Sequence, residues 1–186
     1  MRIEIVRLSA QEQSPVQNQI IEIYQQAFGG PPYYKDANEV RGFTNVFPRH
    51  QARDGFRCVV ARDQETGLLA GFAYGYTGLE GQWWHDLVVR TMEPEMAQLW
   101  MTDVFEVVEV AVLPSMQGYG FGARIHDALL EDLPHRTATL STFQEETVAL
   151  KMYEKRGWVT LLPNFVFPGY EEPYRIMGKM LKQEEG

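Results

Sequence analysis

The spacing of apolar residues along the chain is typical of alternating strands and helices. Residues 2–8 alternate apolar with polar positions, which predicts a half-buried strand. Residues 56–62 and 68–76 are longer apolar runs, and the polar stretch 63–67 between them predicts a hairpin turn. The full set of predicted strands is 2–8, 56–62, 68–76, 104–113, 137–142, 158–162 and 174–180.

Helices are predicted where apolar residues recur every three or four positions. The first is placed at residues 15–28, because Ser14 and Pro15 provide a cap and a first-turn proline, and a Gly-Gly-Pro-Pro run follows Phe28. The aromatic segment 81–86 is interpreted as a loop. The full set of predicted helices is 15–28, 36–47, 94–100, 120–133 and 145–156.

Length and composition fit one globular domain. The chain has 186 residues, of which 45% are hydrophobic and 23% charged, and this is enough apolar material for one core. Neither a repeat nor a low-complexity linker interrupts the order of strands and helices. We therefore expect a single α/β domain over residues 1–186.

Charge and the N-terminal sequence argue against several classes of partner. The formal net charge is −8 and the sequence has no run of Lys or Arg, so a nucleic-acid partner is not expected. The first residues lack the apolar core of a signal peptide, and no window approaches the ~18 apolar residues of a membrane span. These features predict a cytoplasmic protein that does not enter a membrane.

Cysteine and histidine content gives no sign of a metal site. Cys58 is the only cysteine, which excludes an internal disulfide and makes thiolate ligation of a metal implausible. Its apolar surroundings favour a buried structural thiol over a reactive one. The histidines do not have the spacing of a metal-binding motif, so we expect no metal.

A strand, a glycine-rich turn and the start of a helix follow one another over residues 110–123. Gly118, Gly120 and Gly122 can adopt positive φ and expose backbone N–H groups, and the following helix adds the positive end of its dipole. Such a turn binds phosphate oxygens. The absence of a G-K-[ST] sequence argues against a nucleotide P-loop. A turn that serves only the packing of the helix stays an alternative.

Two motifs in this half of the chain resemble those of the GNAT superfamily of N-acetyltransferases. Residues 117–122 match the coenzyme-A-binding turn Q/R-x-x-G-x-G/A, and residues 149–158 are similar to the helix end A-x-x-x-Y-x-x-x-G-F/W. The resemblance is specific over residues 105–160. One departure is Glu146, which stands where many members have an asparagine that contacts the coenzyme.

The resemblance implies a fold and a co-substrate. The fold is a mixed, mostly antiparallel sheet of about seven strands, flanked by helices and splayed between strands four and five. The co-substrate is acetyl-CoA. By resemblance, the coenzyme-binding residues are Val110, Ala111, Val112, Gln117, Gly118, Tyr119, Gly120, Phe121, Gly122 and Ala123.

The same resemblance implies the groups that move protons during acetyl transfer. Tyr153 matches the motif tyrosine that acts as general acid towards the leaving thiolate, with a packed aromatic residue as the alternative. Family members carry a glutamate base at either of two positions of strand four, here Glu106 and Glu109. Side chains alternate along a strand, so these two point to opposite faces, and we favour Glu109 as the one nearer the thioester.

The site of the acceptor has no transferable motif. We expect aromatic side chains at the end of the strand 68–76 and in the segment after it to line the acceptor pocket. For the two tryptophans the alternative is a role in a dimer contact or in the packing of the core. The candidates are Tyr74, Tyr76, Trp83, Trp84 and His85. The expected acceptor is a primary amine of a small molecule or of a peptide. A non-catalytic acyl-CoA-binding module is the competing function, and a homodimer is compatible with exposed aromatic residues.

Overall fold

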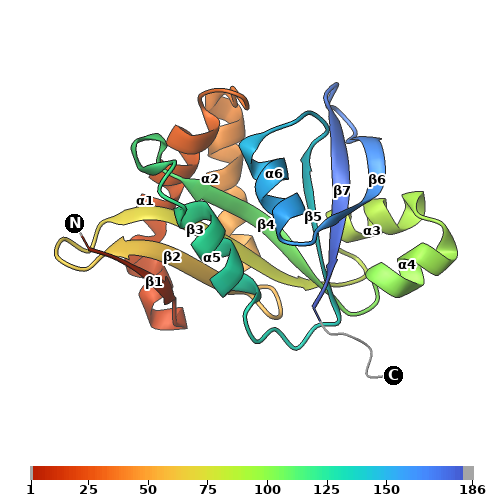
Figure 1. Cartoon of the computed structure of the whole chain (residues 1–186), viewed down its shortest axis with the longest axis horizontal. Coiled ribbons are helices and arrows are strands. Elements are labelled where there is room, and N and C mark those ends of the chain that lie inside the picture. The colour runs from red at the N-terminus through yellow and green to blue at the C-terminus, as the bar shows by residue number, and fades with distance from the viewer. Residues whose placement is uncertain (1, 182–186) are drawn as a thin grey trace. The chain divides into compact units, whose positions relative to one another are not determined.

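Seven strands and the helices between them make up the fold of this computed structural model, which describes residues 2–181 (Figure 1). The strands are β1 Ile3–Arg7, β2 Arg57–Asp63, β3 Leu69–Gly78, β4 Val104–Val112, β5 Thr137–Phe143, β6 Val159–Val166 and β7 Pro173–Met180. Their order in the sheet is β1-β2-β3-β4-β5-β7-β6, with β4 and β5 parallel and the sheet otherwise mostly antiparallel. The predicted fold class and all seven predicted strands are confirmed.

The helices include the five that were predicted and one that was not. They are α1 Ala10–Phe28, α2 Ala37–Gln51, α3 Trp83–Thr91, α4 Pro94–Trp100, α5 Phe121–Leu130 and α6 Val148–Lys155, and a short 3-10 helix spans Pro114–Met116. Among residues 2–181, no helix has both the length and the apolar character that a membrane crossing requires.

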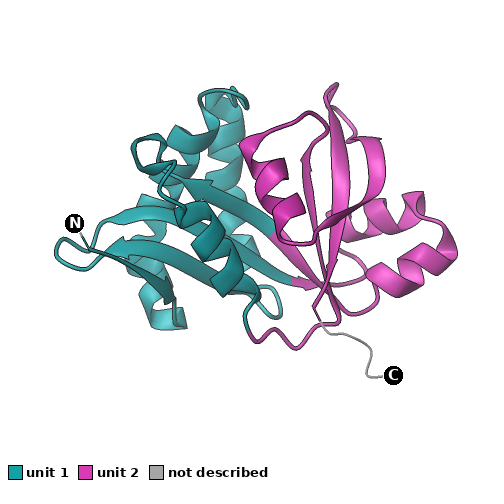
Figure 2. Cartoon of the chain, viewed as in Figure 1, with its two compact units in different colours: residues 1–76, 108–131 teal, residues 77–107, 132–186 magenta. Residues whose placement is uncertain are grey.

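The chain divides into two compact units, which Figure 2 colours separately. Unit 1 comprises residues 1–76 and 108–131, and unit 2 comprises residues 77–107 and 132–186. Strands β3 and β4 each begin in one unit and continue in the other. The expectation of a single domain stays a prediction.

Aromatic side chains form the core of unit 1. The rings of Tyr24 and Phe43 are stacked with centroids 3.8 Å apart, and Phe47 meets Tyr74 edge-on at 5.1 Å. Burial of such rings contributes both apolar area and ring–ring attraction, so helices α1 and α2 are held firmly on strands β2 and β3. The aromatic cluster of unit 1 consists of Tyr24, Phe28, Phe43, Phe47, Phe72, Tyr74 and Tyr76.

Helix α1 begins five residues before the predicted start. Ser9 precedes it, and the Ser9 backbone N–H donates to Oε2 of Glu12 at 2.9 Å, as in a capping box. Pro15 therefore lies inside the helix rather than in its first turn, and the predicted boundary at residue 15 was wrong.

Two arginines stabilise the C-terminal end of α5. Arg57 donates through Nη1 to the carbonyls of Leu129 and Glu131 at 3.2 and 2.5 Å, and Arg7 donates through Nη2 to the Glu131 carbonyl at 3.1 Å. The last turn of α5 has no basic residue of its own, so β1 and β2 supply the cations that its carbonyl end attracts. The helix ends at Leu130, three residues before the predicted end.

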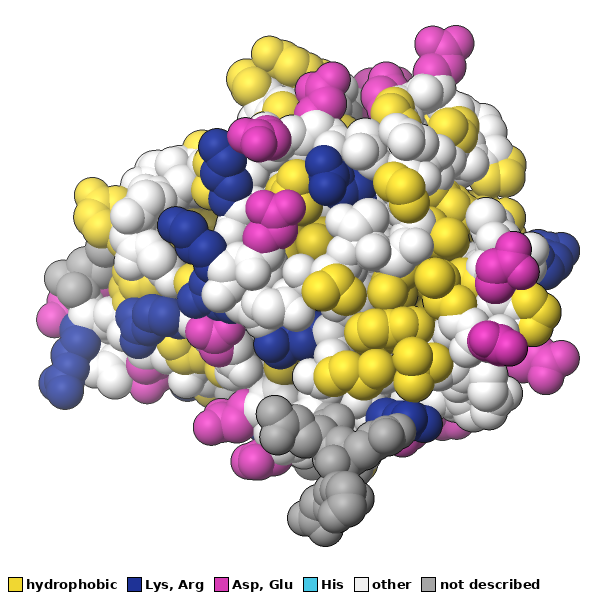
Figure 3. All heavy atoms as spheres, turned by 45° about the vertical axis from the view of Figure 1, so that its right-hand side comes forward, with side chains coloured by type: hydrophobic (Ala, Val, Ile, Leu, Met, Phe, Trp, Pro, Cys, Tyr) yellow, Lys and Arg dark blue, Asp and Glu magenta, His cyan; other side chains and the backbone are white. Residues whose placement is uncertain are grey.

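Unit 2 contains the helix that was not predicted. The segment interpreted as an aromatic loop instead starts α3, in which Val88 is fully buried. Nε2 of His85 donates to the Met101 carbonyl at 3.0 Å, so a contact from outside the helix holds its first turn. Figure 3 shows apolar side chains gathered on the surface, and the exposed large apolar residues of unit 2 include Trp83, Val159 and Met180.

Strand β6 is at one end of the sheet order and is irregular. Its pairing with β7 shifts register twice, between Thr160 and Leu162 and between Leu162 and Phe165. Pro163 has no N–H to donate, and Asn164 has a positive φ of 52°. These two residues bend the backbone of β6, so β6 is not a regular edge strand of the sheet.

The contact of half-buried His50 with buried Tyr74 predicts a pH-dependent stability. His50 Nδ1 lies 2.9 Å from the Tyr74 hydroxyl, and burial followed by the charges of Arg53 and Arg49 lowers the pKa of His50 from 6.5 to about 4. The unfolded chain then binds an extra proton between these values, so the free energy of unfolding should fall as pH decreases from 6.5 to 4. We expect a fall of roughly 1–2 kcal/mol, because solvent screens part of the effect at a half-buried imidazole.

Chemical denaturation of His50→Asn across this pH range tests the assignment. The variant should lack that part of the pH dependence, whereas Tyr74→Phe, which leaves the imidazole able to titrate, should retain it. An equal slope in the wild type and in His50→Asn contradicts the assignment.

Candidate active site

The turn between β4 and α5 has the geometry of an anion-binding site in unit 1. The Leu113 N–H donates to the Ala70 carbonyl at 2.9 Å, and Nε2 of Gln117 donates to the Val112 carbonyl at 3.2 Å, so the β4 side of the turn is fixed. Gly118 and Gly120 have φ values of 84° and 79°. A Cβ added to either glycine would meet nothing within 4 Å, so glycine is required here by the backbone conformation and not by lack of space.

Helix α5 presents its first N–H groups at this turn. Gly120 is the N-cap residue and has no side chain to accept from them, and the first turn contains no acidic residue. Arg124 is exposed one turn into the helix, with its guanidinium carbon 5.8 Å from the Phe121 ring centroid. The turn can therefore hold phosphate oxygens, and Arg124 is a nearby cation that the sequence analysis missed.

The strand before the turn places Glu109 on a half-buried part of β4. Close approach of β3 is required here, because a Cβ on Gly71 would lie 2.7 Å from the Ala111 carbonyl. Glu109 retains some solvent access, yet the surrounding protein removes water from its carboxyl group and raises its pKa, which Lys35 in turn lowers. A carboxyl group with a raised pKa is suited to accept a proton.

The other two catalytic candidates lie in unit 2. Glu106 is 5% exposed and is paired with Thr139 in the parallel register of β4 and β5. Tyr153 is 7% exposed on α6, where its ring meets that of Trp158 edge-on at 5.8 Å. The Trp158 N–H donates to the Tyr153 carbonyl at 3.2 Å, and Gly157 between them has a φ of 78°. The end of the second motif therefore fixes the tyrosine ring.

The predicted acceptor-site residues are divided between the units. Tyr74 and Tyr76 belong to the core of unit 1 and are 0% and 2% exposed, which favours a packing role. Trp84 packs against the core of unit 2, whereas Trp83 is 58% exposed and stacks on Phe167 with centroids 6.0 Å apart. The role of these residues in binding an acceptor stays a prediction. The predicted loop position was wrong for Trp83, Trp84 and His85, which lie in α3, whereas Tyr74 and Tyr76 lie on the predicted strand.

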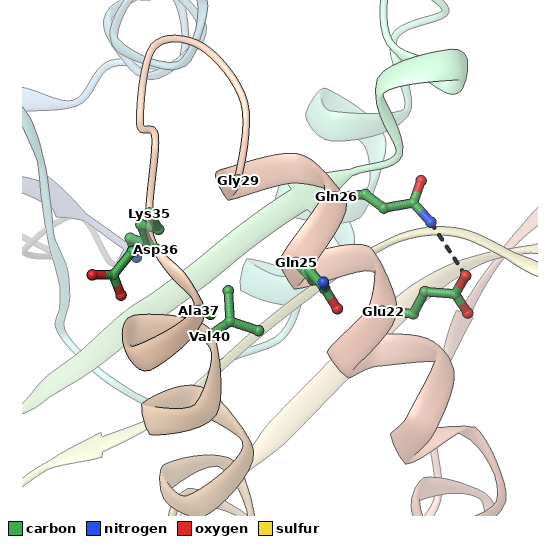
Figure 4. A pocket seen from close by; sticks show the side chains of 8 residues that line it. All are labelled: Glu22, Gln25, Gln26, Gly29, Lys35, Asp36, Ala37 and Val40. Carbon is green, nitrogen blue, oxygen red and sulfur yellow. Dashed lines mark hydrogen bonds between the residues drawn. The ribbon is translucent and has the colours of Figure 1, made fainter.

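An open hollow lies on the surface of each unit. The hollow in unit 1 has a volume of about 570 Å³ and lies between α1 and the start of α2, where Lys35 projects from the connecting loop (Figure 4). The hollow in unit 2 has a volume of about 330 Å³ and is lined in part by His85 and Met101. Within residues 2–181, no three His, Cys, Asp or Glu side chains form a group that could hold a metal ion, and the expectation of no metal stays a prediction.

Comparison with known families decides the classification. The sequence profile of the acetyltransferase (GNAT) family matches residues 18–158. The chain belongs to the GNAT family of acetyltransferases. The predicted family is confirmed, and GNAT enzymes use acetyl-CoA.

Individual relatives support the same classification. A GCN5-like protein acetyltransferase of Mycobacterium tuberculosis is 30% identical to this GNAT chain over an alignment of 139 residues, and the match covers 70% of this chain and 68% of the relative. The arylalkylamine N-acetyltransferase 2 of Aedes aegypti has a TM-score of 0.66 and 14% identity, over 98% of this chain and 100% of that one. The yncA protein of Salmonella typhimurium, solved with its cofactor acetyl-CoA, has a TM-score of 0.60 and 12% identity, over 100% and 98%. The two solved structures show the shared fold.

A substitution in the glycine turn of this GNAT protein should weaken coenzyme binding separately from its effect on stability. Gly120→Ala places a Cβ in the left-handed region, which should cost about 1–2 kcal/mol of stability and distort the N–H groups at the start of α5. We expect the rise in melting temperature on adding coenzyme A to be largely lost.

Gly169→Ala is the matched control. Gly169 has a φ of 86° and open space around it, but it lies in the loop between β6 and β7. It should lose similar stability and keep the full response to coenzyme A. Equal responses of the two variants would falsify the assignment of the turn.

Proposed function

We propose that this chain transfers the acetyl group of acetyl-CoA to a primary amine that attacks the thioester directly while both substrates are bound. The observation that carries the proposal is the open left-handed turn at the N-terminus of α5, in a chain that the GNAT family matches over residues 18–158. Residues 117–123 would hold the pyrophosphate through backbone N–H groups, and the backbone of Val110, Ala111 and Val112 would hold the pantetheine arm and the thioester.

Glu109 is our choice for the group that accepts the proton of the acceptor amine. Attack on a thioester needs a neutral amine, and a carboxylate with a raised pKa holds an abstracted proton better than an exposed one. Glu106 is the alternative, and its 5% exposure makes access by a bulky acceptor harder. Proton transfer from the amine to Glu109 leaves the nitrogen lone pair available to form the new C–N bond.

Tyr153 is our choice for the general acid. When the C–S bond breaks, the leaving thiolate needs a proton, and a phenol hydroxyl can supply it. The ring is held by Trp158 and by the helix end at Gly157, so the hydroxyl is presented from a fixed position. A hydroxyl group held in one orientation contributes more to catalysis than a mobile one, because it loses less rotational freedom when the transition state forms.

The acceptor that we propose is an amine of a protein, either a lysine or an N-terminus. This choice is supported by the Mycobacterium tuberculosis relative, whose name describes it as a protein acetyltransferase. The open hollow between α1 and α2 also suits an extended segment better than a small enclosed ligand. A small-molecule amine is the second candidate, supported by the aromatic residues of α3.

Release of free thiol from acetyl-CoA with a panel of peptide and small amines tests the function. Wild-type protein should release thiol only when an amine is present, whereas a non-catalytic binding module should bind coenzyme A without turnover. Glu109→Gln should lower kcat/KM by about 10²-fold. In the wild type kcat/KM should rise with pH as the Glu109 carboxyl group ionises, and this rise should be absent in the variant. The same profile with Glu106→Gln identifies the base, and an unaltered rise in both variants removes both candidates.

Replacement of the tyrosine tests the acid separately. Tyr153→Phe should lower kcat by roughly 10²-fold or more and leave the affinity for coenzyme A unchanged, because the ring packing is kept. Tyr170→Phe, at a residue of unit 2 that is 48% exposed, is the control and should behave as wild type. Full kcat in Tyr153→Phe would show that another group protonates the thiolate.

A further inference from the structure

An exposed aromatic ring and an exposed cation lie beside the glycine turn of unit 1. The Tyr119 ring stacks on that of Phe121, with centroids 6.1 Å apart and an angle of 28° between the ring planes. The guanidinium carbon of Arg124 is 5.8 Å from the centroid of the same Phe121 ring. Tyr119 is 68% exposed and Arg124 is also exposed, whereas Phe121 is buried. One buried ring therefore packs against two groups that solvent can reach.

The backbone of the turn holds Tyr119 in place. The residues on either side of it, Gly118 and Gly120, have left-handed φ values of 84° and 79°. The Arg124 N–H donates to the Gly120 carbonyl at 3.2 Å and closes the first turn of α5. Tyr119 lies in a defined turn but contributes little to the core, so much of its ring surface is accessible to a planar group of a ligand.

Arg124 lies where a helix disfavours a cation. The start of an α-helix carries the positive end of its dipole, and Arg124 is the fourth residue of α5. Within residues 2–181, no hydrogen bond or ion pair involves its guanidinium group. Asp127 is the acidic residue of this helix, and its Oδ1 lies 2.9 Å from Nδ1 of His126 instead. Helix stability and ion pairing do not account for the arginine, and its charge is available to an anion.

The chemistry of coenzyme A matches these two side chains. Its pyrophosphate joins a pantetheine arm to an adenosine, which carries a further phosphate on the 3′ oxygen of its ribose. If residues 117–123 hold the pyrophosphate and the pantetheine arm runs along β4, the adenosine has to leave the turn away from β4. Adenine stacks on aromatic side chains, and a guanidinium group binds phosphate through two parallel hydrogen bonds.

We propose that Tyr119 and Arg124 bind the adenosine 3′-phosphate end of coenzyme A, with the Tyr119 ring stacked on the adenine and the Arg124 guanidinium paired with the 3′-phosphate. This inference rests on the proposed coenzyme site at the glycine turn. It goes beyond that site, because backbone N–H groups bind any pyrophosphate, whereas these two side chains distinguish the coenzyme that carries the 3′-phosphate from one that lacks it.

Two coenzymes that differ by one phosphate test the arginine. The dissociation constants of coenzyme A and of 3′-dephospho-coenzyme A are measured by titration calorimetry at one salt concentration. Wild-type protein should bind coenzyme A roughly 10- to 100-fold more tightly, as expected for a charge-assisted pair with phosphate. Arg124→Gln, which keeps a good helix former without the charge, should bind both coenzymes equally. Arg124→Lys should keep part of the preference, because it keeps the charge and loses the planar group.

Substitutions of the tyrosine test the stacking. Tyr119→Leu should weaken the binding of both coenzymes by the same factor, roughly tenfold, because both contain the adenine. Tyr119→Phe keeps the ring and should bind both as the wild type does. Arg41→Gln, at an exposed arginine of α2, is the matched control for the loss of one positive charge and should leave both dissociation constants unchanged.

The outcomes distinguish this inference from the proposed function. An equal ratio of the two dissociation constants in the wild type and in Arg124→Gln overturns the role of the arginine, and unchanged affinities in Tyr119→Leu overturn the role of the tyrosine. In both cases the binding of coenzyme A by the wild type still supports the proposed site at the turn. Failure of the wild type to bind coenzyme A overturns that site and this inference together.

Discussion

The aromatic cluster of unit 1 is the packing interaction on which most of the proposed site depends. Tyr24 and Phe28 hold the ammonium of Lys35, and Tyr74 belongs to β3, whose Gly71 lies against the backbone of β4. The same rings therefore set the loop that carries the cation and the strand that carries the carboxylate. Close-packed rings of this kind shift together, so the loop 29–36 and strand β3 are held by the core and not by surface contacts.

Charge is distributed unevenly over a chain whose net charge is −8. The first turn of α5 has no acidic residue and is accompanied by Arg124, and the opposite end of the helix is bonded to Arg7 and Arg57. No acidic side chain of that first turn would therefore oppose an anion at the proposed coenzyme site. A net negative charge also favours the approach of cationic amines, so the two proposed substrates would meet different electrostatic environments.

Local sequence patterns predicted the strands and the glycine turn. Both depend on residues that are close together in the sequence, namely the alternation of apolar positions and the glycines that adopt a left-handed backbone. The start of α1 was misplaced because Ser9 with Glu12 and Ser14 with Pro15 are both valid start signals, and the sequence does not show which of them is used. Helix α3 was missed because Gln82 makes no side-chain cap and the contact of His85 with Met101 spans 16 residues. Lys35 was missed because its effect on Glu109 joins positions far apart in the sequence, which only the folded chain brings together.

The irregular strand β6 has a consequence for association of the protein with itself. A regular edge strand offers a row of free N–H and C=O groups on which a strand of another copy can add, and repeated addition leads to aggregates. Pro163 removes one donor from that row, and the backbone turn at Asn164 interrupts its spacing. A second copy therefore cannot continue the sheet across this part of β6, and any self-association of this GNAT chain there has to proceed through side chains, which can be limited to a closed pair rather than an open-ended fibre.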